Sequence, residues 1–281
     1  MSKKKPVEPY SKKPYISAMA IDSHAHLDYE QISSSDVIEN MQSDGLCAII
    51  SIATGLESFS RVEQILKLSP RVYFALGLHP YDIDKFDENF VNSVRRIKEA
   101  YPQKMVAVGE IGLDLHGETP PIADQERVMR EQLILANELN LPVVLHIRGA
   151  HQEAKELLRK NRHLLSRGGV VHCFSGTKED AKDYLDLGLN ISFTGAITYI
   201  KPSEKQEQAE LLRSIPLDRI MIETDCPYLS PAPYRGKVNT PKMTLVVAEY
   251  ISDILEMNVN DFINITTANT TKLFGLIGLN F

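Results

Sequence analysis

Cysteine is scarce in this sequence, and long apolar runs are missing from it. The three cysteines, Cys47, Cys173 and Cys226, form no paired framework, which argues against a disulfide-stabilised scaffold and fits a reducing compartment. No uncharged apolar stretch approaches the roughly 18 residues that cross a bilayer. The lysine-containing start lacks the apolar segment of a secretory signal. These absences predict a cytoplasmic protein that does not enter a membrane.

An excess of positive charge is also missing. The net charge is −6 at pH 7, whereas proteins that coat nucleic acid need a large basic face to neutralise phosphates. A nuclease that acts locally at a strand end remains compatible with this charge. Only residues 1–17 are distinctly basic, and their lysines and prolines with few apolar neighbours predict a flexible leader ahead of the domain. A nucleic-acid or targeting arm is the alternative interpretation.

Three motifs of common enzyme classes do not occur. The sequence has no GxSxG nucleophile elbow and no GxxxxGK[ST] phosphate loop, so serine hydrolysis and nucleotide-triphosphate chemistry are poorly supported. No glycine-rich dinucleotide loop follows the first apolar run.

Short apolar runs alternate with segments of helical spacing from Ile16 onward. Most runs are continuous rather than alternating in polarity, as is typical of strands buried on both faces of a parallel sheet. In a chain of 281 residues, such strand-then-helix units predict one α/β domain over residues 18–281, a closed (β/α)8 TIM barrel, with an open doubly wound sheet as the alternative. The runs are Ala18 to Ile21, Cys47 to Ala53, Val72 to Leu76, Met105 to Val108, Val143 to Leu145, Val170 to Val171, Ile191 to Phe193 and Ile220 to Ile222.

Metal-binding side chains recur at the carboxyl ends of these runs. Those ends converge on one mouth of a barrel, so residues far apart in sequence meet there. A divalent-metal site is therefore predicted. Its ligands are His24 and His26 after the first run, Glu110 after the fourth, His146 after the fifth, His172 after the sixth and Asp225 after the eighth.

The predicted roles follow from spacing and ligand chemistry. His24 and His26 are two residues apart, which places both imidazoles on one side of an extended segment. Glu110 has two oxygens and can bridge two ions about 3.5 to 4 Å apart, with His146 and His172 on the second ion. Asp225 is expected to bind the first ion and to accept a proton from the attacking water.

Each ligand also has a plain structural interpretation. Singly, the histidines could be core residues bonded to protein groups, Glu110 a solvated turn residue and Asp225 a structural aspartate before Pro227. Glu223 competes locally with Asp225, which is preferred because it lies nearer the mouth. The occurrence of so many ligand types at one predicted mouth favours metal binding. Cys173 and Cys226 adjoin ligands but are expected to pack rather than to react.

The chain resembles the TatD family of metal-dependent deoxyribonucleases, within the amidohydrolase-like barrels. The resemblance spans residues 21 to 275 and rests on an ordered set of segments: IDSHAHLD, GLHP, VGEIGLD, LPVVLHIR, VHCFSGT, ETDCPYLSPAPYRGKVNTP and ANTTKLFG. It implies a TIM barrel, one to three divalent ions, and phosphodiester hydrolysis as a 3′ exonuclease on DNA. It also implies the same six metal ligands.

Two features depart from the family, and one separates this chain from its relatives. Leu115 and His116 stand where the family usually has an aromatic residue, and the basic leader is extra. Neither change touches a proposed ligand. Glu110 stands where phosphotriesterase-like relatives carry a carboxylated lysine, which favours phosphodiester over amide chemistry.

The expected activity is cleavage of phosphodiester bonds at DNA ends, with two divalent ions per chain. Imidazole and carboxylate ligands suit Zn²⁺ or Mn²⁺, whereas Mg²⁺ prefers fewer imidazoles. The alternatives are a small-molecule ester, lactone or amide hydrolase and a non-catalytic binding protein. Substrate contacts are expected from cations that pair with phosphate and from a tyrosine that stacks a terminal base: Arg148, Arg235, Lys237 and Tyr228, with Tyr81 as a second stacking residue.

Overall fold

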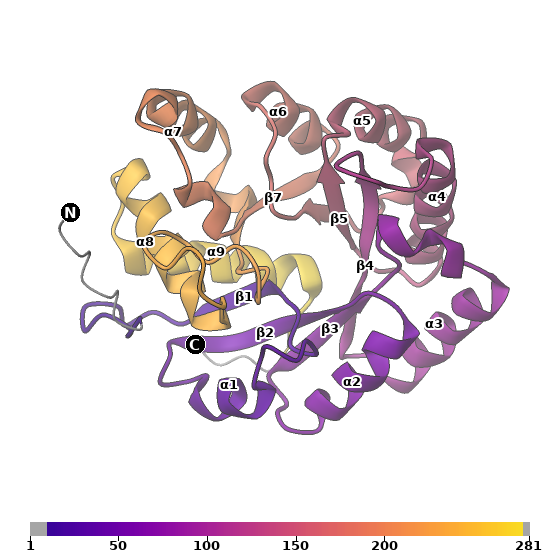
Figure 1. The fold of residues 1–281 in the computed structure, drawn as a ribbon, viewed down its shortest axis with the longest axis horizontal. Coiled ribbons are helices and arrows are strands. Elements are labelled where there is room, and N and C mark those ends of the chain that lie inside the picture. Colours follow the sequence, from indigo (N-terminus) through magenta and orange to yellow (C-terminus); the bar gives the residue numbers. More distant parts are fainter. Residues whose placement is uncertain (1–9, 278–281) are drawn as a thin grey trace.

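The computed structural model describes residues 10–277, which form a single parallel β-barrel surrounded by helices (Figure 1). The strands pair in sequence order, each parallel to the next, and every residue of the longest strand is buried. The expected (β/α)8 TIM barrel is confirmed. The strands are β1 Ala20–Ala25, β2 Leu46–Ala53, β3 Val72–Leu76, β4 Met105–Asp114, β5 Val143–Arg148, β6 Gly169–Val171, β7 Leu189–Phe193 and β8 Ile220–Ile222.

The barrel is closed where β1 meets the segment after β8. Ala25 and Cys226 form a parallel bridge. The His26 amide donates to the Cys226 carbonyl, and the Asp225 amide donates to the His24 carbonyl, each at 2.9 Å. The chain that closes the barrel is therefore the chain that carries two of the predicted ligand segments.

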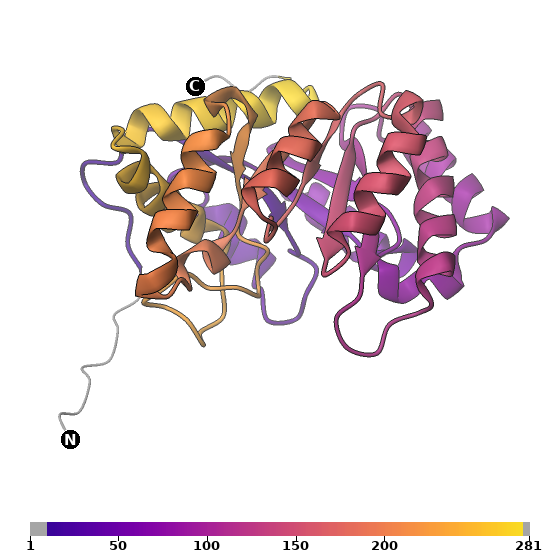
Figure 2. The same cartoon turned by 90° about the horizontal axis from the view of Figure 1, so that it is seen from above.

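Helices cover the outside of the sheet, and the last one covers an end. Thr267 and Asn269 of α9 donate to carbonyls of Met19 and Ile220, which lie at the amino ends of β1 and β8. Figure 2 shows α9 along one side of the molecule, with the loops that follow the strands on the opposite side. The helices are α1 Ser34–Asn40, α2 Leu56–Leu66, α3 Glu88–Ala100, α4 Ile122–Glu138, α5 His151–Lys160, α6 Lys178–Asp186, α7 Lys205–Ser214, α8 Thr244–Leu255 and α9 Val259–Phe274, with short 3-10 turns η1 Pro80–Lys85, η2 Arg162–Leu164, η3 Gly195–Thr198, η4 Pro202–Glu204, η5 Leu217–Arg219 and η6 Pro241–Met243.

Three strands extend further toward the mouth than their apolar runs indicated. The runs ended at Ile21, Val108 and Leu145, whereas β1, β4 and β5 continue to Ala25, Asp114 and Arg148. The ligands His24, Glu110 and His146 consequently lie within strands, not after them. Polar side chains near the ends of these strands face the mouth, so the run of apolar residues in the sequence ends before the strand ends.

The leader is partly packed on the barrel. Residues 1–9 of the expected leader lie outside the described residues. From Tyr10 onward the chain lies against α8 and α9: Tyr10 and Ile16 are buried, and the amides of Ser17 and Ala18 donate to Asn260 Oδ1 of α9. The apolar side chains among the lysines account for this packing, because their burial removes apolar surface from water.

None of the helices formed by residues 10–277 has both the length and the apolar character that crossing a bilayer requires.

Candidate metal centre

A cavity of about 560 Å³ opens at the carboxyl ends of the strands. The structure brings all six predicted ligands together at this end of the barrel. Five of them line the cavity, and His24, fully buried on β1, is not among the lining residues. The five are His26, Glu110, His146, His172 and Asp225.

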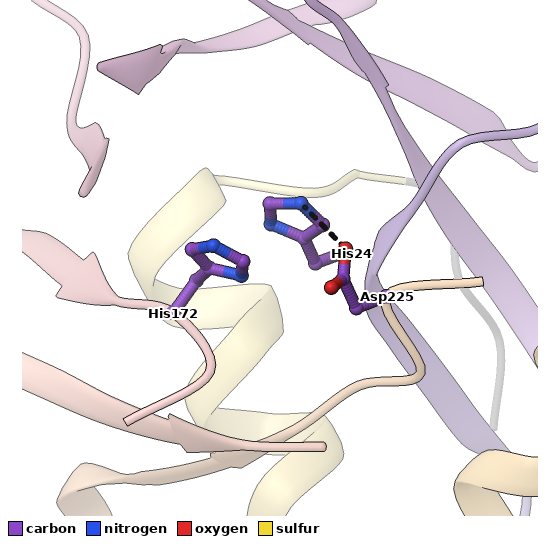
Figure 3. A group of neighbouring side chains, drawn as sticks. All are labelled: His24, His172 and Asp225. Carbon is purple, nitrogen blue, oxygen red and sulfur yellow. Dashed lines mark ion pairs between the residues drawn. The ribbon is translucent and has the colours of Figure 1, made fainter. Parts of the chain in front are cut away.

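The first group of ligands comes from the two segments that close the barrel. Asp225 Oδ1 lies 3.3 Å from His26 Nε2 and 3.6 Å from His24 Nε2. Figure 3 shows Asp225 beside His24, with the His172 ring across from them. The rings of His24 and His172 are stacked with centroids 3.9 Å apart. The stacked His24 and His172 rings therefore bring the first group into contact with the second group of ligands, to which His172 belongs.

The second group comes from β4, β5 and the chain after β6. Glu110 Oε1 lies 2.6 Å from His146 Nδ1 and 2.7 Å from His172 Nε2. The other oxygen of the same carboxylate, Oε2, lies 3.5 Å from His24 Nε2. One oxygen of Glu110 thus faces each group, which is the arrangement that a bridging carboxylate requires.

Buried nitrogen atoms without hydrogen bonds show that this donor set fits divalent ions. Among the described residues, both ring nitrogens of His24 are buried without a hydrogen-bond partner, and its Nε2 is the atom that faces Glu110 and Asp225. Leaving such a group unpaired costs free energy, and a cation that accepts the lone pair of Nε2 removes this cost for that atom. The donor atoms of His24, His26 and Glu110, and those of Glu110, His146 and His172, each lie within 4.8 Å of one another.

The concentration of charge perturbs the protonation of the second group. Burial alone would raise the pKa of Glu110, but His172 and His146 hold that pKa well below its usual value. Burial likewise opposes protonation of His172, yet the Glu110 carboxylate raises the pKa of His172 well above the ordinary range. The Glu110 carboxylate thus favours positive charge beside it. A divalent cation would supply that charge.

Hydrogen bonds outside the centre fix which nitrogen each of two histidines presents to it. His26 Nδ1 lies 3.3 Å from the Ile52 carbonyl oxygen, an obligate acceptor, so Nδ1 carries a proton and Nε2 is the atom that faces the centre. His146 Nε2 lies 2.8 Å from Asp114 Oδ2, so Nδ1, the atom beside Glu110, is the nitrogen that would bind an ion. Both partners hold a ring in the orientation that metal binding needs.

The end of β8 distinguishes Asp225 from Glu223. Asp225 has a left-handed backbone conformation, with φ of 55°, which aspartate tolerates better than most residues and which turns its carboxylate toward His24 and His26. Glu223 is fully buried and accepts a hydrogen bond from the Cys173 amide at 2.6 Å. Its Oε1 also lies 3.3 Å from His172 Nδ1. Asp225 therefore belongs to the first ligand group. Glu223 contacts His172 at Nδ1, the ring nitrogen that does not face Glu110.

Gly112 sets the distance between the strands that carry Glu110 and His146. It pairs with His146 across β4 and β5, and a Cβ added to it would lie 1.8 Å from the His146 carbonyl oxygen. Backbone atoms cannot move aside as a flexible side chain can. Only glycine therefore fits this position in the described arrangement.

We expect Gly112→Ala to destabilise the protein by about 1–3 kcal/mol or more, because the clash between the added Cβ and the His146 carbonyl oxygen pushes β4 away from β5. Thermal unfolding would then shift down by roughly 2–4 °C for each kcal/mol lost. Gly117→Ala is the control, since Gly117 also has a positive φ but nothing lies within 4 Å of the added Cβ. Equal melting temperatures for the two variants would contradict the close-approach argument.

The predicted substrate residues divide into two sets. Arg148 and Tyr228 line the cavity, as does Tyr81. Within the described chain Arg235 and Lys237 are not among its lining residues, and the Arg235 guanidinium lies over the Tyr199 ring, 4.3 Å from its centroid. Leu115 is exposed and its amide donates to the Arg148 carbonyl, so the unusual Leu115-His116 loop borders the same side of the mouth as Arg148.

Two residues at the mouth were not identified from the sequence as part of the site. His79 follows β3 and lines the cavity, and Asp114 ends β4 and bonds to His146. Both lie in segments that carried the family resemblance, GLHP and VGEIGLD. Their position at strand ends was the signal that could have identified them.

Comparisons with known proteins find a matching family model, related sequences and related structures. A family model described as TatD related DNase matches residues 21–275. The uncharacterized metal-dependent hydrolase YabD of Bacillus subtilis is 36% identical over 260 residues, covering 91% of this chain and 99% of that protein. The similarly named YcfH of Escherichia coli is 34% identical, covering 90% and 95%. The crystal structure of YjjV, a TatD homolog from E. coli, superposes with a TM-score of 0.84 at 32% identity, covering 91% and 98%.

Proposed function

Because this chain belongs to the family of TatD related DNases, whose relatives are named metal-dependent hydrolases, we propose that it is a deoxyribonuclease that removes nucleotides from the 3′ ends of DNA. We also propose that it acts in the cytoplasm, as its unpaired cysteines suggest.

The observation that carries this proposal is the position of Glu110 between two groups of ligands. Its Oε2 faces His24 at 3.5 Å, and its Oε1 faces His146 at 2.6 Å. Such a carboxylate suits a pair of divalent ions about 3.5 to 4 Å apart, the spacing found in enzymes that hydrolyse phosphodiesters. When bound, Zn²⁺, Mn²⁺ or Mg²⁺ ions would neutralise phosphate charge and make water a better nucleophile.

Asp225 is the residue that we assign to proton transfer. Its side chain is part of the cavity wall, and its Oδ1 faces His26 Nε2 and His24 Nε2. Burial opposes its ionisation, but His26 and His24 lower the pKa of Asp225 below the ordinary value. Asp225 is thus a carboxylate at neutral pH and has the form that accepts a proton from the attacking water.

The cavity wall also offers contacts for a strand end. Arg148 lies at the end of β5, two residues beyond His146, and lines the cavity with Tyr81. Tyr228 is half exposed on the rim and packs edge to face on Tyr29, with centroids 5.8 Å apart. We assign Arg148 to a phosphate oxygen and Tyr228 or Tyr81 to stacking of a terminal base. With so few phosphate contacts, affinity should be modest and should fall gently with salt.

Linear single-stranded DNA labelled at its 5′ end should be shortened stepwise by the metal-loaded protein, whereas circular single-stranded DNA should resist it. The reason is that the proposed contacts hold a free strand end and have no means to read bases. Denaturing gels over a time course would show a ladder for the linear strand with little dependence on sequence. Metal-stripped protein is the control.

Equal degradation of circular and linear strands would rule out the exonuclease assignment. If no nucleic acid is cut with any of the three metals while a small ester, lactone or amide is hydrolysed, the function is that of a small-molecule hydrolase on the same centre.

A further inference from the structure

His79 lies on the cavity wall beside the metal centre without belonging to either ligand group. It precedes η1, and its side chain is 15% exposed. Its ring packs edge to face on the His146 ring, with centroids 4.4 Å apart. Its Nε2 lies 4.0 Å from Glu110 Oε1, which is beyond hydrogen-bond distance. The question is what this imidazole presents to the cavity.

The local backbone determines the position of the proton on His79. His79 is the N-cap of η1, and its Nδ1 accepts a hydrogen bond from the Tyr81 amide at 3.2 Å. An amide is only a donor, so Nδ1 must carry the lone pair and Nε2 the proton. His79 therefore presents an N–H to the cavity. His26 and His146 are oriented differently, since each turns one ring nitrogen away from the centre to an acceptor, the Ile52 carbonyl and Asp114.

The same reasoning argues against a third metal ion at His79. Donor atoms of His79, Asp114 and His146 lie within 4.8 Å of one another, but each is already used. Asp114 Oδ2 pairs with His146 Nε2 at 2.8 Å, and Asp114 Oδ1 accepts from the His116 amide at 2.7 Å. His79 Nε2 carries a proton and has no lone pair in the ring plane for a cation.

We propose that His79 Nε2–H donates a hydrogen bond to an anionic oxygen of the substrate's phosphoryl group in the cavity that His79 lines together with Arg148. The inference rests on the proposed function and extends it, because it names a substrate-binding residue and the atom that it recognises. The donor is fixed before the substrate arrives: the N-cap bond to Tyr81 holds the ring, and packing on His146 holds its tilt.

Binding of inorganic phosphate to metal-loaded protein, measured by calorimetry, tests this proposal. His79→Leu should weaken binding about 10- to 100-fold, as loss of a hydrogen bond to a charged group predicts. His79→Gln keeps an N–H donor and should retain most of the affinity. His116→Leu is the matched control, because His116 is a nearby imidazole that does not line the cavity, and should bind as the parent does. The metal content of all variants should equal that of the parent.

Each remaining outcome overturns the proposal. His79→Leu protein that loses an equivalent of metal would make His79 a ligand, and unchanged phosphate affinity, or a parent that binds no phosphate, would remove the donor role. Failure of the nuclease assignment is separate: a parent that binds phosphate through His79 but cuts no DNA leaves this inference standing and refutes the other.

Discussion

Glu110→Ala protein is expected to lose metal from both groups, leaving it with little of the parent's metal after gel filtration. Glu110 Oε2 faces His24 at 3.5 Å, and Oε1 faces His146 and His172 at 2.6 and 2.7 Å. Its removal takes one donor from each group and also the negative charge that offsets two cations in a buried site. Elemental analysis of the purified protein gives the metal per chain directly.

His172→Ala is the matched comparison for Glu110→Ala. His172 Nε2 lies beside the Glu110 oxygen that faces the second group, so its loss should weaken mainly one ion. Both variants need thermal unfolding curves, because each removes a buried side chain. Unchanged metal in a folded Glu110→Ala protein would refute the bridging role, and equal losses in the two variants would mean that the two groups fill together.

The fold was predictable because the strands of a parallel barrel are buried on both faces and therefore consist of continuous apolar runs. Runs such as Val72 to Leu76 and Ile220 to Ile222 coincide with β3 and β8. The approximate meeting point of the ligands followed from one rule, that the carboxyl ends of the strands share a mouth. Position along the chain was thus sufficient to select His172 and Asp225, although they are not neighbours in sequence.

The details of the site depend on contacts that no local pattern contains. β4 runs on to Asp114 because the Cβ-less Gly112 lets it approach β5, and apolarity alone could not indicate this. The orientation of the His26 ring depends on the Ile52 carbonyl, which comes into place only when β1 and β2 pair. The positions of charged side chains in loops could not be predicted either: Arg235 was expected to contact substrate, but its guanidinium lies over the Tyr199 ring.

Asp225→Asn is expected to reduce kcat by about 100-fold or more, the contribution of a well-placed general base, while the protein keeps its fold and at least one ion. An amide offers an oxygen to a cation, but it cannot accept the proton that a carboxylate accepts. The backbone should tolerate the change, because asparagine also adopts the left-handed conformation found at Asp225.

Turnover of end-labelled DNA by Asp225→Asn protein, measured at saturating metal and normalised to metal content, separates the proton-transfer role from loss of a ligand. Glu223→Gln is the matched control, because Glu223 is a buried carboxylate two residues earlier that contacts the Cys173 amide, the Ser23 hydroxyl and His172 Nδ1. It does not line the cavity, so its loss of charge should reduce kcat far less than that of Asp225. Activity of Asp225→Asn within about threefold of the parent, far less than a general base contributes, would remove Asp225 from proton transfer. A larger loss of kcat in Glu223→Gln than in Asp225→Asn would assign proton transfer to Glu223.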